Sequence, residues 1–301
     1  MEPKKISHFK RARLLIKAAS ATLKADKELV LIPLVSFFIG LFVFIVGIVA
    51  IVLLNYLTRA QGSIGWDFDL HSWASYLGYV VMYITMAFIS TFTAAALFAG
   101  ATMRFRGEDA SVKQALTDAK AKIKPLFVYS LFIGTIGLIL QTIENRVPLA
   151  GKITVWLFNA VWSVANIFSI PVIMSSKEDV TPLQATRGSV QIIKKVWGEN
   201  AIAQMGVGII ALLYIVGVMV FGAILGSLVP SNATIGINLI VPILMVIALF
   251  VIGIVFSTLS AIVRAAVFHY ATTGESPDQF SEGLLKQTMT IKKSRKIFAG
   301  R

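Results

Sequence analysis

Six long apolar runs set what this chain can fold into. They cover residues 34–57, 74–103, 126–143, 153–174, 201–229 and 235–271. About 20 apolar residues in an α-helix, rising about 1.5 Å each, cross a hydrocarbon layer about 30 Å thick. We therefore expect an all-α polytopic membrane protein. Its six transmembrane helices form three hairpins, and residues 1–301 make a single integral membrane domain.

Composition agrees with a membrane location, because 56% of the residues are hydrophobic and only 14% are charged. An ordinary soluble domain has about 25% charged residues. The first apolar run follows a long basic segment and exceeds the ~7–15 residues of a signal-peptide core, so we expect a retained span. The last run, at roughly 55 Å, is too long for one crossing and should protrude into the cytoplasm. Pro242 can kink this helix.

The charges predict the orientation. Of the 28 Lys and Arg residues, 25 fall on the N-terminal side of the six spans, together with 12 of the 15 acids. The net charge of +13 thus lies on one face, which the positive-inside rule assigns to the cytoplasm. We expect a multi-pass protein of the cytoplasmic (plasma) membrane with both termini inside. Topology accounts for the basic charge, so nucleic acid is not expected as a partner.

Related blocks recur on this basic side: "EDASVKQA" at 108–115, "EDVTPLQA" at 178–185, and the looser "ESPDQF" at 275–280. Each contains S/T-x-x-Q, the capping box that starts a helix. The cap residues are Ser111 with Gln114, Thr181 with Gln184, and Ser276 with Gln279. With the N-terminal segment, these blocks predict interfacial helices at 8–24, 111–124, 181–197 and 277–292.

These helices are predicted to be amphipathic. In 181–197 the expected apolar residues are Leu183, Val190, Ile193 and Trp197. Such helices lie at a membrane surface with their basic side toward anionic headgroups. The candidate contacts with anionic lipid are Lys10, Arg11, Arg13, Lys17, Lys194 and Lys195.

The ends of two spans also resemble each other. "TAAALFAGATMRFRGE" (93–108) closes the second span and "LSAIVRAAVFHYATTGE" (259–275) closes the sixth. Divergent triplication of a unit, one interfacial helix followed by a hairpin, is the simplest explanation. Small residues also pack helices in membranes, and we interpret Gly222-x-x-x-Gly226 in that way.

Two longer stretches carry a family resemblance. They are "ARLLIKAASATLKADKELVLIPLVSFF" (12–38) and "SIPVIMSSKEDVTPLQATRGS" (169–189). The chain resembles an uncharacterised prokaryotic family of six-span integral membrane proteins, domain-of-unknown-function family DUF6159 or a sister family. The resemblance implies six helices and no established activity, and it carries over no catalytic residue.

Catalytic and metal-binding signals are weak. The chain has no cysteine, no H-E-x-x-H, P-loop or G-x-S-x-G motif, and no acid, lysine or histidine in the middle of a span. We therefore expect no enzyme activity and no cofactor. Arg264 is the ionisable residue nearest to a span centre, and it can snorkel to the interface. Asp67, Asp69 and His71 in "WDFDLHSW" alternate as metal ligands would, although interfacial aromatic residues explain this segment more simply.

The fourth span carries a polar stripe. Its members recur at intervals of four, three and three: Asn159, Ser163, Asn166 and Ser169. The stripe is a candidate solute path, or it hydrogen-bonds neighbouring helices. Two functions follow. The first is a non-enzymatic protein that binds membrane lipid, a protein partner or a second copy of itself. The alternative is a small-solute permease or the membrane subunit of a transporter.

Overall fold

The fold is described from a computed structural model covering residues 8–58, 73–196, 201–227, 235–278 and 280. These residues form helices and no strand. Six helical segments are long and apolar enough to cross a membrane, which makes this a multi-pass membrane protein. They are Lys27–Leu57, Ser75–Phe105, Ile123–Arg146, Gly151–Ser175, Gly208–Ser227 and Leu239–Thr273. The predicted all-helical, six-span fold is thus confirmed.

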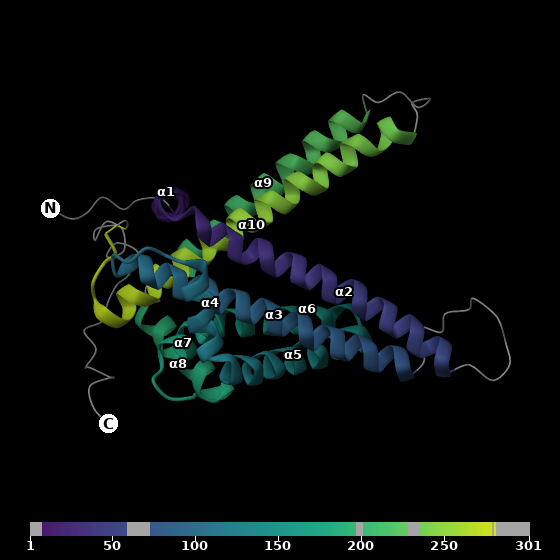
Figure 1. The fold of residues 1–301 in the computed structure, drawn as a ribbon, viewed down its shortest axis with the longest axis horizontal. Coiled ribbons are helices and arrows are strands. Elements are labelled where there is room, and N and C mark those ends of the chain that lie inside the picture. Colours follow the sequence, from purple (N-terminus) through teal and green to yellow (C-terminus); the bar gives the residue numbers. More distant parts are fainter. Residues whose placement is uncertain (1–7, 59–72, 197–200, 228–234, 279, 281–301) are drawn as a thin grey trace. The chain divides into compact units, whose positions relative to one another are not determined.

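Figure 1 labels the helices along the chain. Their bounds are α1 His8–Ala25, a 3-10 turn at Lys27–Val30, α2 Leu31–Thr58, α3 Trp73–Phe105, α4 Val112–Ala121, α5 Ile123–Arg146, α6 Leu149–Ala165, α7 Ser169–Ser175, α8 Pro182–Val196, α9 Ala201–Ser227 and α10 Ile235–Thr273. They fall into two compact units. Unit 1 comprises Met1–Pro33, Gly100–Gln114 and Gln191–Arg301, and unit 2 comprises Leu34–Ala99 and Ala115–Val190.

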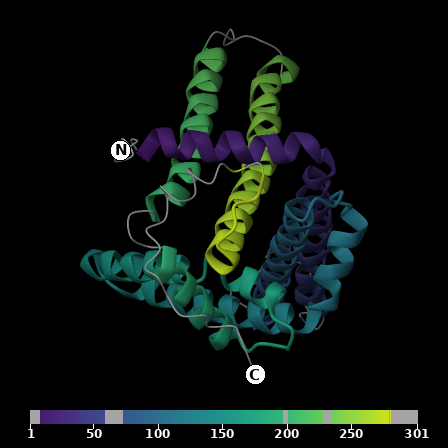
Figure 2. The same cartoon turned by 90° about the vertical axis from the view of Figure 1, so that its left-hand side faces the viewer.

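In unit 1, α9 and α10 form a hairpin and α1 crosses both of them (Figure 2). Leu15, Ala19 and Thr22 are buried on one side of α1. Their spacing of four and three residues places them on a single helix face. In the structure α1 packs against the third hairpin, although it precedes the first hairpin in the sequence.

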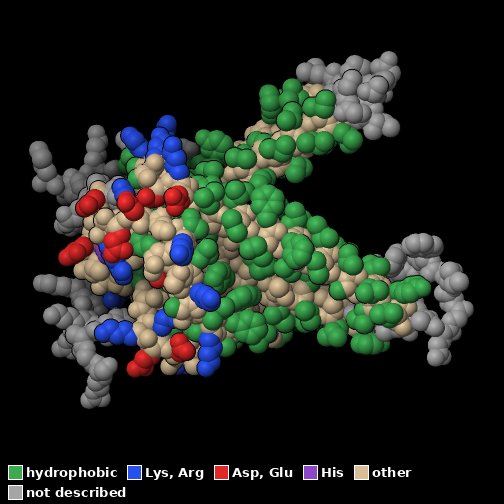
Figure 3. Space-filling model, in the orientation of Figure 1, with side chains coloured by type: hydrophobic (Ala, Val, Ile, Leu, Met, Phe, Trp, Pro, Cys, Tyr) green, Lys and Arg blue, Asp and Glu red, His purple; other side chains and the backbone are tan. Residues whose placement is uncertain are grey.

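The α9–α10 hairpin packs through a glycine. A side chain at Gly222 would overlap Met245 Sδ, and nearer the start of α9 the rings of Tyr214 and Phe256 lie 5.6 Å apart. Gly226, the other glycine of the predicted motif, faces open space. Elsewhere hydrophobic side chains cover the hairpin surface (Figure 3). Such a surface is stable against lipid tails, which are as apolar as the side chains.

The two similar span ends have the same backbone conformation. Gly107 follows α3 with φ +80°, and Gly274 follows α10 with φ +79°. Glycine is the residue that most readily adopts this left-handed conformation after a helix. Beside these ends, the ring of Phe105 contacts His269 and the buried Phe280, each with centroids 6.1 Å apart. Both the capping glycines and the ring contacts lie in unit 1.

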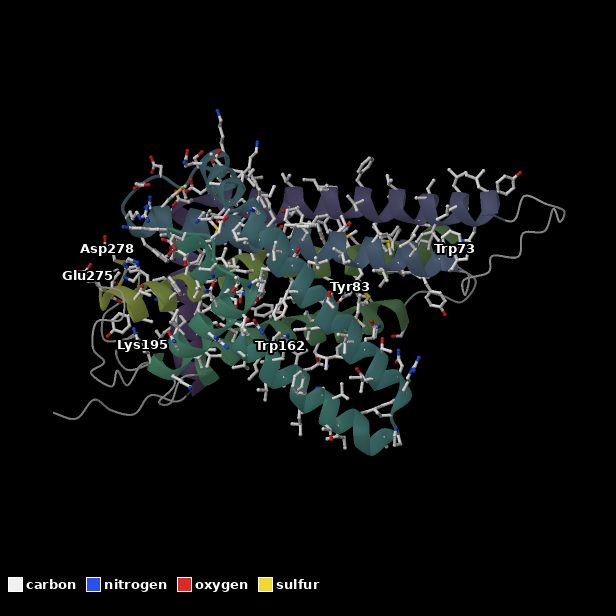
Figure 4. All side chains as sticks on the ribbon, turned by 90° about the horizontal axis from the view of Figure 1, so that it is seen from below. Trp73, Tyr83, Trp162, Lys195, Glu275 and Asp278 are labelled. Atoms are coloured by element: carbon white, nitrogen blue, oxygen red, sulfur yellow. The ribbon has the colours of Figure 1, made fainter. Side chains whose placement is uncertain are left out.

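Unit 2 contains the other two hairpins. Gly78 of α3 lies so close to Ile51 of α2 that a Cβ there would overlap Ile51 Cγ1. Near the far end of this hairpin, buried Asn55 donates a hydrogen bond of 2.8 Å to Ser75. In the second hairpin, Trp162 of α6 (Figure 4) contacts Phe132 of α5 with ring centroids 6.0 Å apart. Close glycine contacts and aromatic pairs thus hold these helices together.

The fourth span is not one continuous helix, which corrects the prediction of a single helix over 153–174. Residues 166–168 form a turn between α6 and α7. Pro171 explains the break, because it has no N–H to donate to the carbonyl of Ile167 four residues earlier. Asn166 and Ser169 therefore do not continue the helical face of Asn159 and Ser163.

The last span is a single helix of 39 residues that continues through Pro242. At 1.5 Å per residue it is about 58 Å long, longer than a bilayer of about 40–45 Å including headgroups. Of the predicted helix 277–292, the described residues are not helical: Pro277 is irregular, Asp278 lies in a turn and Phe280 in a bend. Gln279 and residues 281–292 lie outside the described part of the chain.

Candidate functional site

The turn between α6 and α7 is organised around the side-chain amide of Asn166. Its Oδ1 accepts hydrogen bonds from Tyr129 of α5 at 3.2 Å, Ser169 of α7 at 3.1 Å and Thr186 of α8 at 2.8 Å. Its Nδ2 donates to the carbonyl of Trp162 at 2.8 Å. Four helices are thus joined at one residue, and all of these groups lie in unit 2. We call Tyr129, Asn166, Ser169 and Thr186 the Asn166 cluster.

Helix α8 faces the turn with small and polar residues. Ala185, Thr186 and Ser189 are buried, and Ser189 Oγ accepts a hydrogen bond of 2.9 Å from the backbone N–H of Phe168. Gly188 allows close packing, since a Cβ there would lie 3.0 Å from Val172 of α7. Leu183, one of the apolar residues expected in this helix, is 50% exposed. Small residues permit the close approach of helices that packing in membranes requires.

The cluster satisfies its own polar groups, which bears on the candidate solute path. Asn166 Oδ1 already accepts three hydrogen bonds and Nδ2 donates one. Ser169 is fully buried, while Asn159 is half-buried and Ser163 exposed. The structure therefore brings Asn166 and Ser169 together but does not bring the other two members of the stripe into the cluster. This arrangement favours hydrogen bonding between helices over a polar path.

On α1, the candidate lipid-contact residues Arg13 and Lys17 are exposed. The side chains of Lys10 and Arg11 lie outside the described residues. Ile16 and Leu23 are half-buried and remain partly accessible beside the basic residues. Helix α1 thus packs one face on unit 1 and leaves a mixed basic and apolar face uncovered.

Helices α4 and α8 show the same separation of faces. In α4, Ala115 and Ala119 are fully buried, while Lys113 and Lys120 are exposed. In the last turn of α8, Lys194 is exposed and Lys195 (Figure 4) is half-buried. Basic residues in the last turn also interact favourably with the negative end of the helix dipole.

The three predicted capping boxes differ in how many of their expected hydrogen bonds the structure shows. At α8, Gln184 Oε1 accepts from the Thr181 N–H at 2.8 Å, and Thr181 Oγ1 accepts from the Gln184 N–H at 3.4 Å. These are the two reciprocal bonds of a capping box. Ser111 lies directly before α4, three residues before Gln114. Ser276 donates to the carbonyl of Phe280 at 2.8 Å, and Gln279 is not described.

The ion pairs of Arg104 and Lys122 were not anticipated from the sequence. In unit 1, Arg104 Nε lies 3.3 Å from Asp26 Oδ2, with side chains 26% and 9% exposed. This pair ties the segment after α1 to the end of α3. In unit 2, Lys122 Nζ donates to the carbonyl of Lys177 at 3.3 Å and lies 4.0 Å from Asp179. The only sequence signal was a charged residue beside a helix boundary, which does not identify its partner.

The remaining candidates contribute no further described site. Asp67, Asp69 and His71 lie outside the described residues, and the described part of the chain contains no group of three His, Cys, Asp or Glu suited to a metal. Arg264 lies within α10, where its Nε donates to the carbonyl of Ser260 at 3.3 Å.

Comparison with known proteins places the chain in a family. The family of unknown function DUF6159 matches residues 73–278, about two thirds of the chain. No curated protein and no solved structure matches it.

Proposed function

The chain belongs to the family of unknown function DUF6159, and we propose that it is a non-enzymatic membrane protein that binds anionic lipid through its basic interfacial helices. The observation that carries this proposal is the division of α1 into two faces. Leu15, Ala19 and Thr22 are buried in the protein, whereas Arg13 and Lys17 are exposed. A helix fixed in this way holds its basic residues at a constant depth beside the membrane.

The half-buried residues Ile16 and Leu23 support this reading. They supply apolar surface next to the basic side chains, as expected for a helix at the boundary of headgroups and acyl chains. Each Lys or Arg near an anionic surface contributes about 1 kcal/mol to the attraction. The proposal includes the cytoplasmic membrane as location and both termini inside, because 25 of 28 basic residues lie on that side of the spans.

We prefer lipid binding to the permease alternative because of the Asn166 cluster. A polar path needs groups that can exchange their hydrogen bonds with a passing solute. The amide of Asn166 is already bonded to Tyr129, Ser169, Thr186 and the carbonyl of Trp162. Such a cluster is better suited to holding helices together by hydrogen bonds than to lining a solute path.

The test compares lipid selectivity of the parent with that of a variant in which Lys10, Arg11, Arg13 and Lys17 are all changed to Gln. Selectivity is the association of spin-labelled phosphatidylglycerol relative to phosphatidylcholine with the reconstituted protein. We expect the variant to lose most of the preference for phosphatidylglycerol, and 0.5 M salt to weaken that of the parent. The matched control changes Arg146 and Lys152, on the sparsely charged side, to Gln. Unchanged selectivity in the four-residue variant would refute the proposal.

Orientation has its own test, because the chain contains no cysteine. A single cysteine placed at Lys4 should react in intact cells only with membrane-permeant reagents. Labelling by an impermeant reagent would place the N-terminus outside.

A further inference from the structure

Arg264 lies in the most enclosed part of α10. Within 258–270, every residue except Ser260, Arg264 and His269 is buried, and these three are half-buried. The guanidinium group remains protonated under all ordinary conditions. A permanent charge in an enclosed, apolar setting is costly unless an anion neutralises it.

No such anion is found in the described part of the chain. There Arg264 forms no ion pair, and its one hydrogen bond joins Nε to the carbonyl of Ser260 at 3.3 Å. Arg104, the other half-buried arginine among the described residues of unit 1, differs in this respect. It is paired with Asp26 at 3.3 Å and with Asp109 at 3.7 Å. Both arginines are half-buried, but among the described residues only Arg104 has an acidic partner within the protein.

The helix face around Arg264 is the least covered face of this segment. Ser257 and Ser260 precede Arg264 by seven and four residues, so the three side chains share one face. Ser257 is exposed and Ser260 is half-buried, whereas Thr258, Leu259 and the apolar residues 261–263 are buried. A ligand can therefore approach Arg264 along a face that also carries two hydroxyl groups.

The position along α10 identifies the source of the anion. Arg264 follows Ile235, the first residue of α10, by 29 positions, or about 44 Å along the helix axis. A bilayer including its headgroups is about 40–45 Å thick. With the start of α10 at the opposite surface, Arg264 reaches the level of the cytoplasmic headgroups. Phospholipid phosphates, good bidentate partners for guanidinium, are concentrated at that level.

We propose that Arg264, with Ser257 and Ser260, binds the phosphate of one anionic phospholipid. This site differs from the surface attraction of the interfacial helices, and it does not rest on that proposal. A partly enclosed ion pair is screened by salt much less than an exposed one. The bound lipid should consequently remain at salt concentrations that release lipid held at the protein surface.

The experiment measures phospholipid retained by protein extracted in mild detergent and washed with 0.5 M NaCl, where the Debye length is about 4 Å. Native mass spectrometry of the parent should show about one phospholipid per chain. Arg264→Gln should lower this occupancy at least tenfold, while Arg264→Lys keeps part of it. Arg146→Gln removes the same charge from an exposed helix end and should leave the occupancy unchanged. The proposed site would be refuted if Arg264→Gln kept the full phospholipid occupancy, or if the washed parent carried no phospholipid.

A second variant protects the test against misfolding. Ser260→Leu keeps the charge but narrows access on the same face, so it should lower occupancy while the helical content and elution volume stay those of the parent. Undiminished occupancy in this variant would contradict the proposed approach along Ser257 and Ser260.

The last arm separates a lipid from a free anion. Delipidated parent is titrated with short-chain phosphatidylglycerol and, separately, with inorganic phosphate, while its melting temperature is followed. We expect the lipid to stabilise the parent at a concentration at least tenfold below that of phosphate, and Arg264→Gln to lose this shift. Equal stabilisation by inorganic phosphate would overturn the lipid assignment. If the α1 variant loses its selectivity for phosphatidylglycerol but retains one bound phospholipid in this assay, the Arg264 site is independent of the lipid contact of α1.

Discussion

Replacing Asn166 by leucine should destabilise unit 2 by an amount that follows from its hydrogen bonds. The two side chains have similar size, so the change removes the amide without opening a cavity. Thr186 keeps an acceptor, the carbonyl of Pro182 at 3.0 Å. The carbonyl of Trp162 keeps the backbone N–H of residue 166 at 3.2 Å. Tyr129 and Ser169 can hydrogen-bond each other.

One buried hydroxyl of the cluster is therefore left without an acceptor. A buried, unsatisfied polar group costs about 1–3 kcal/mol, and a typical side-chain hydrogen bond in a membrane protein contributes about 0.6 kcal/mol. We expect Asn166→Leu to lower the free energy of unfolding by about 2 kcal/mol. The measurement is a reversible titration with denaturing detergent in mixed micelles, followed by circular dichroism.

Two further variants make the reasoning refutable. Ser163→Ala changes an exposed member of the same predicted stripe and should shift the free energy by less than about 0.5 kcal/mol. Tyr129→Phe and Ser169→Ala, added together to Asn166→Leu, should recover most of the loss because they remove both hydroxyls that shared the Asn166 acceptor. If Asn166→Leu is as stable as Ser163→Ala, or if the added pair of changes gives no recovery, the Asn166 cluster does not stabilise unit 2 as described.

Two predictions concern unit 1 and use the same unfolding measurement. Gly222→Leu places a side chain against Met245 and should destabilise the α9–α10 hairpin by about 1–3 kcal/mol relative to Gly226→Leu. The Gly226→Leu control gains the same helix propensity, but its side chain enters open space. Equal stabilities of the two variants would contradict the packing at Gly222. Asp26→Asn leaves the half-buried Arg104 without its main partner and should lower the free energy of unfolding by about 1–3 kcal/mol. This is less than the roughly 3–5 kcal/mol lost when a fully buried ion pair is broken, because Arg104 retains some exposure. Asp109→Asn, on a fully exposed residue, serves as its control and should leave stability unchanged.

The spans and most of the shorter helices that precede them could be predicted because they depend on local information. A run of about 20 apolar residues has few alternatives to a membrane helix. Thr181 with Gln184 supplies the hydrogen bonds of a helix start within four residues. Gly107 and Gly274 end their helices through a conformation that favours glycine. Each of these signals acts over one helical turn.

The protein-facing sides of the shorter helices were harder to predict. In α8, the apolar residue Leu183 is half exposed, whereas Thr186 and Ser189 are buried. Hydropathy ranks residues by their transfer out of water, but a leucine beside lipid tails loses nothing by facing outward. Small residues then take the protein-facing positions, because they let the helices approach closely. A polar stripe in such a chain is therefore a marker of packing as well as of function.

Long-range partners left no local signal at all. Nothing near Asn166 indicates Tyr129 of α5 as a partner, and nothing near Asp26 indicates Arg104. Pro171 was a signal for the break at residues 166–168. However, the helix continues without interruption through Pro242, so a proline alone does not determine whether a membrane helix is broken. Prolines are tolerated in membrane helices when neighbouring groups satisfy the freed backbone.

The position of α1 has a consequence for the order in which the protein folds. Its buried face, Leu15, Ala19 and Thr22, packs in unit 1 with α9 and α10, whose second helix begins 220 residues after Leu15. At a synthesis rate of about 5–20 residues per second, α1 waits roughly 10–45 s for this partner. An amphipathic helix can spend that time at the membrane surface with its apolar residues in the interface. The same basic residues that we assign to lipid contact would then hold α1 in place until the last hairpin inserts.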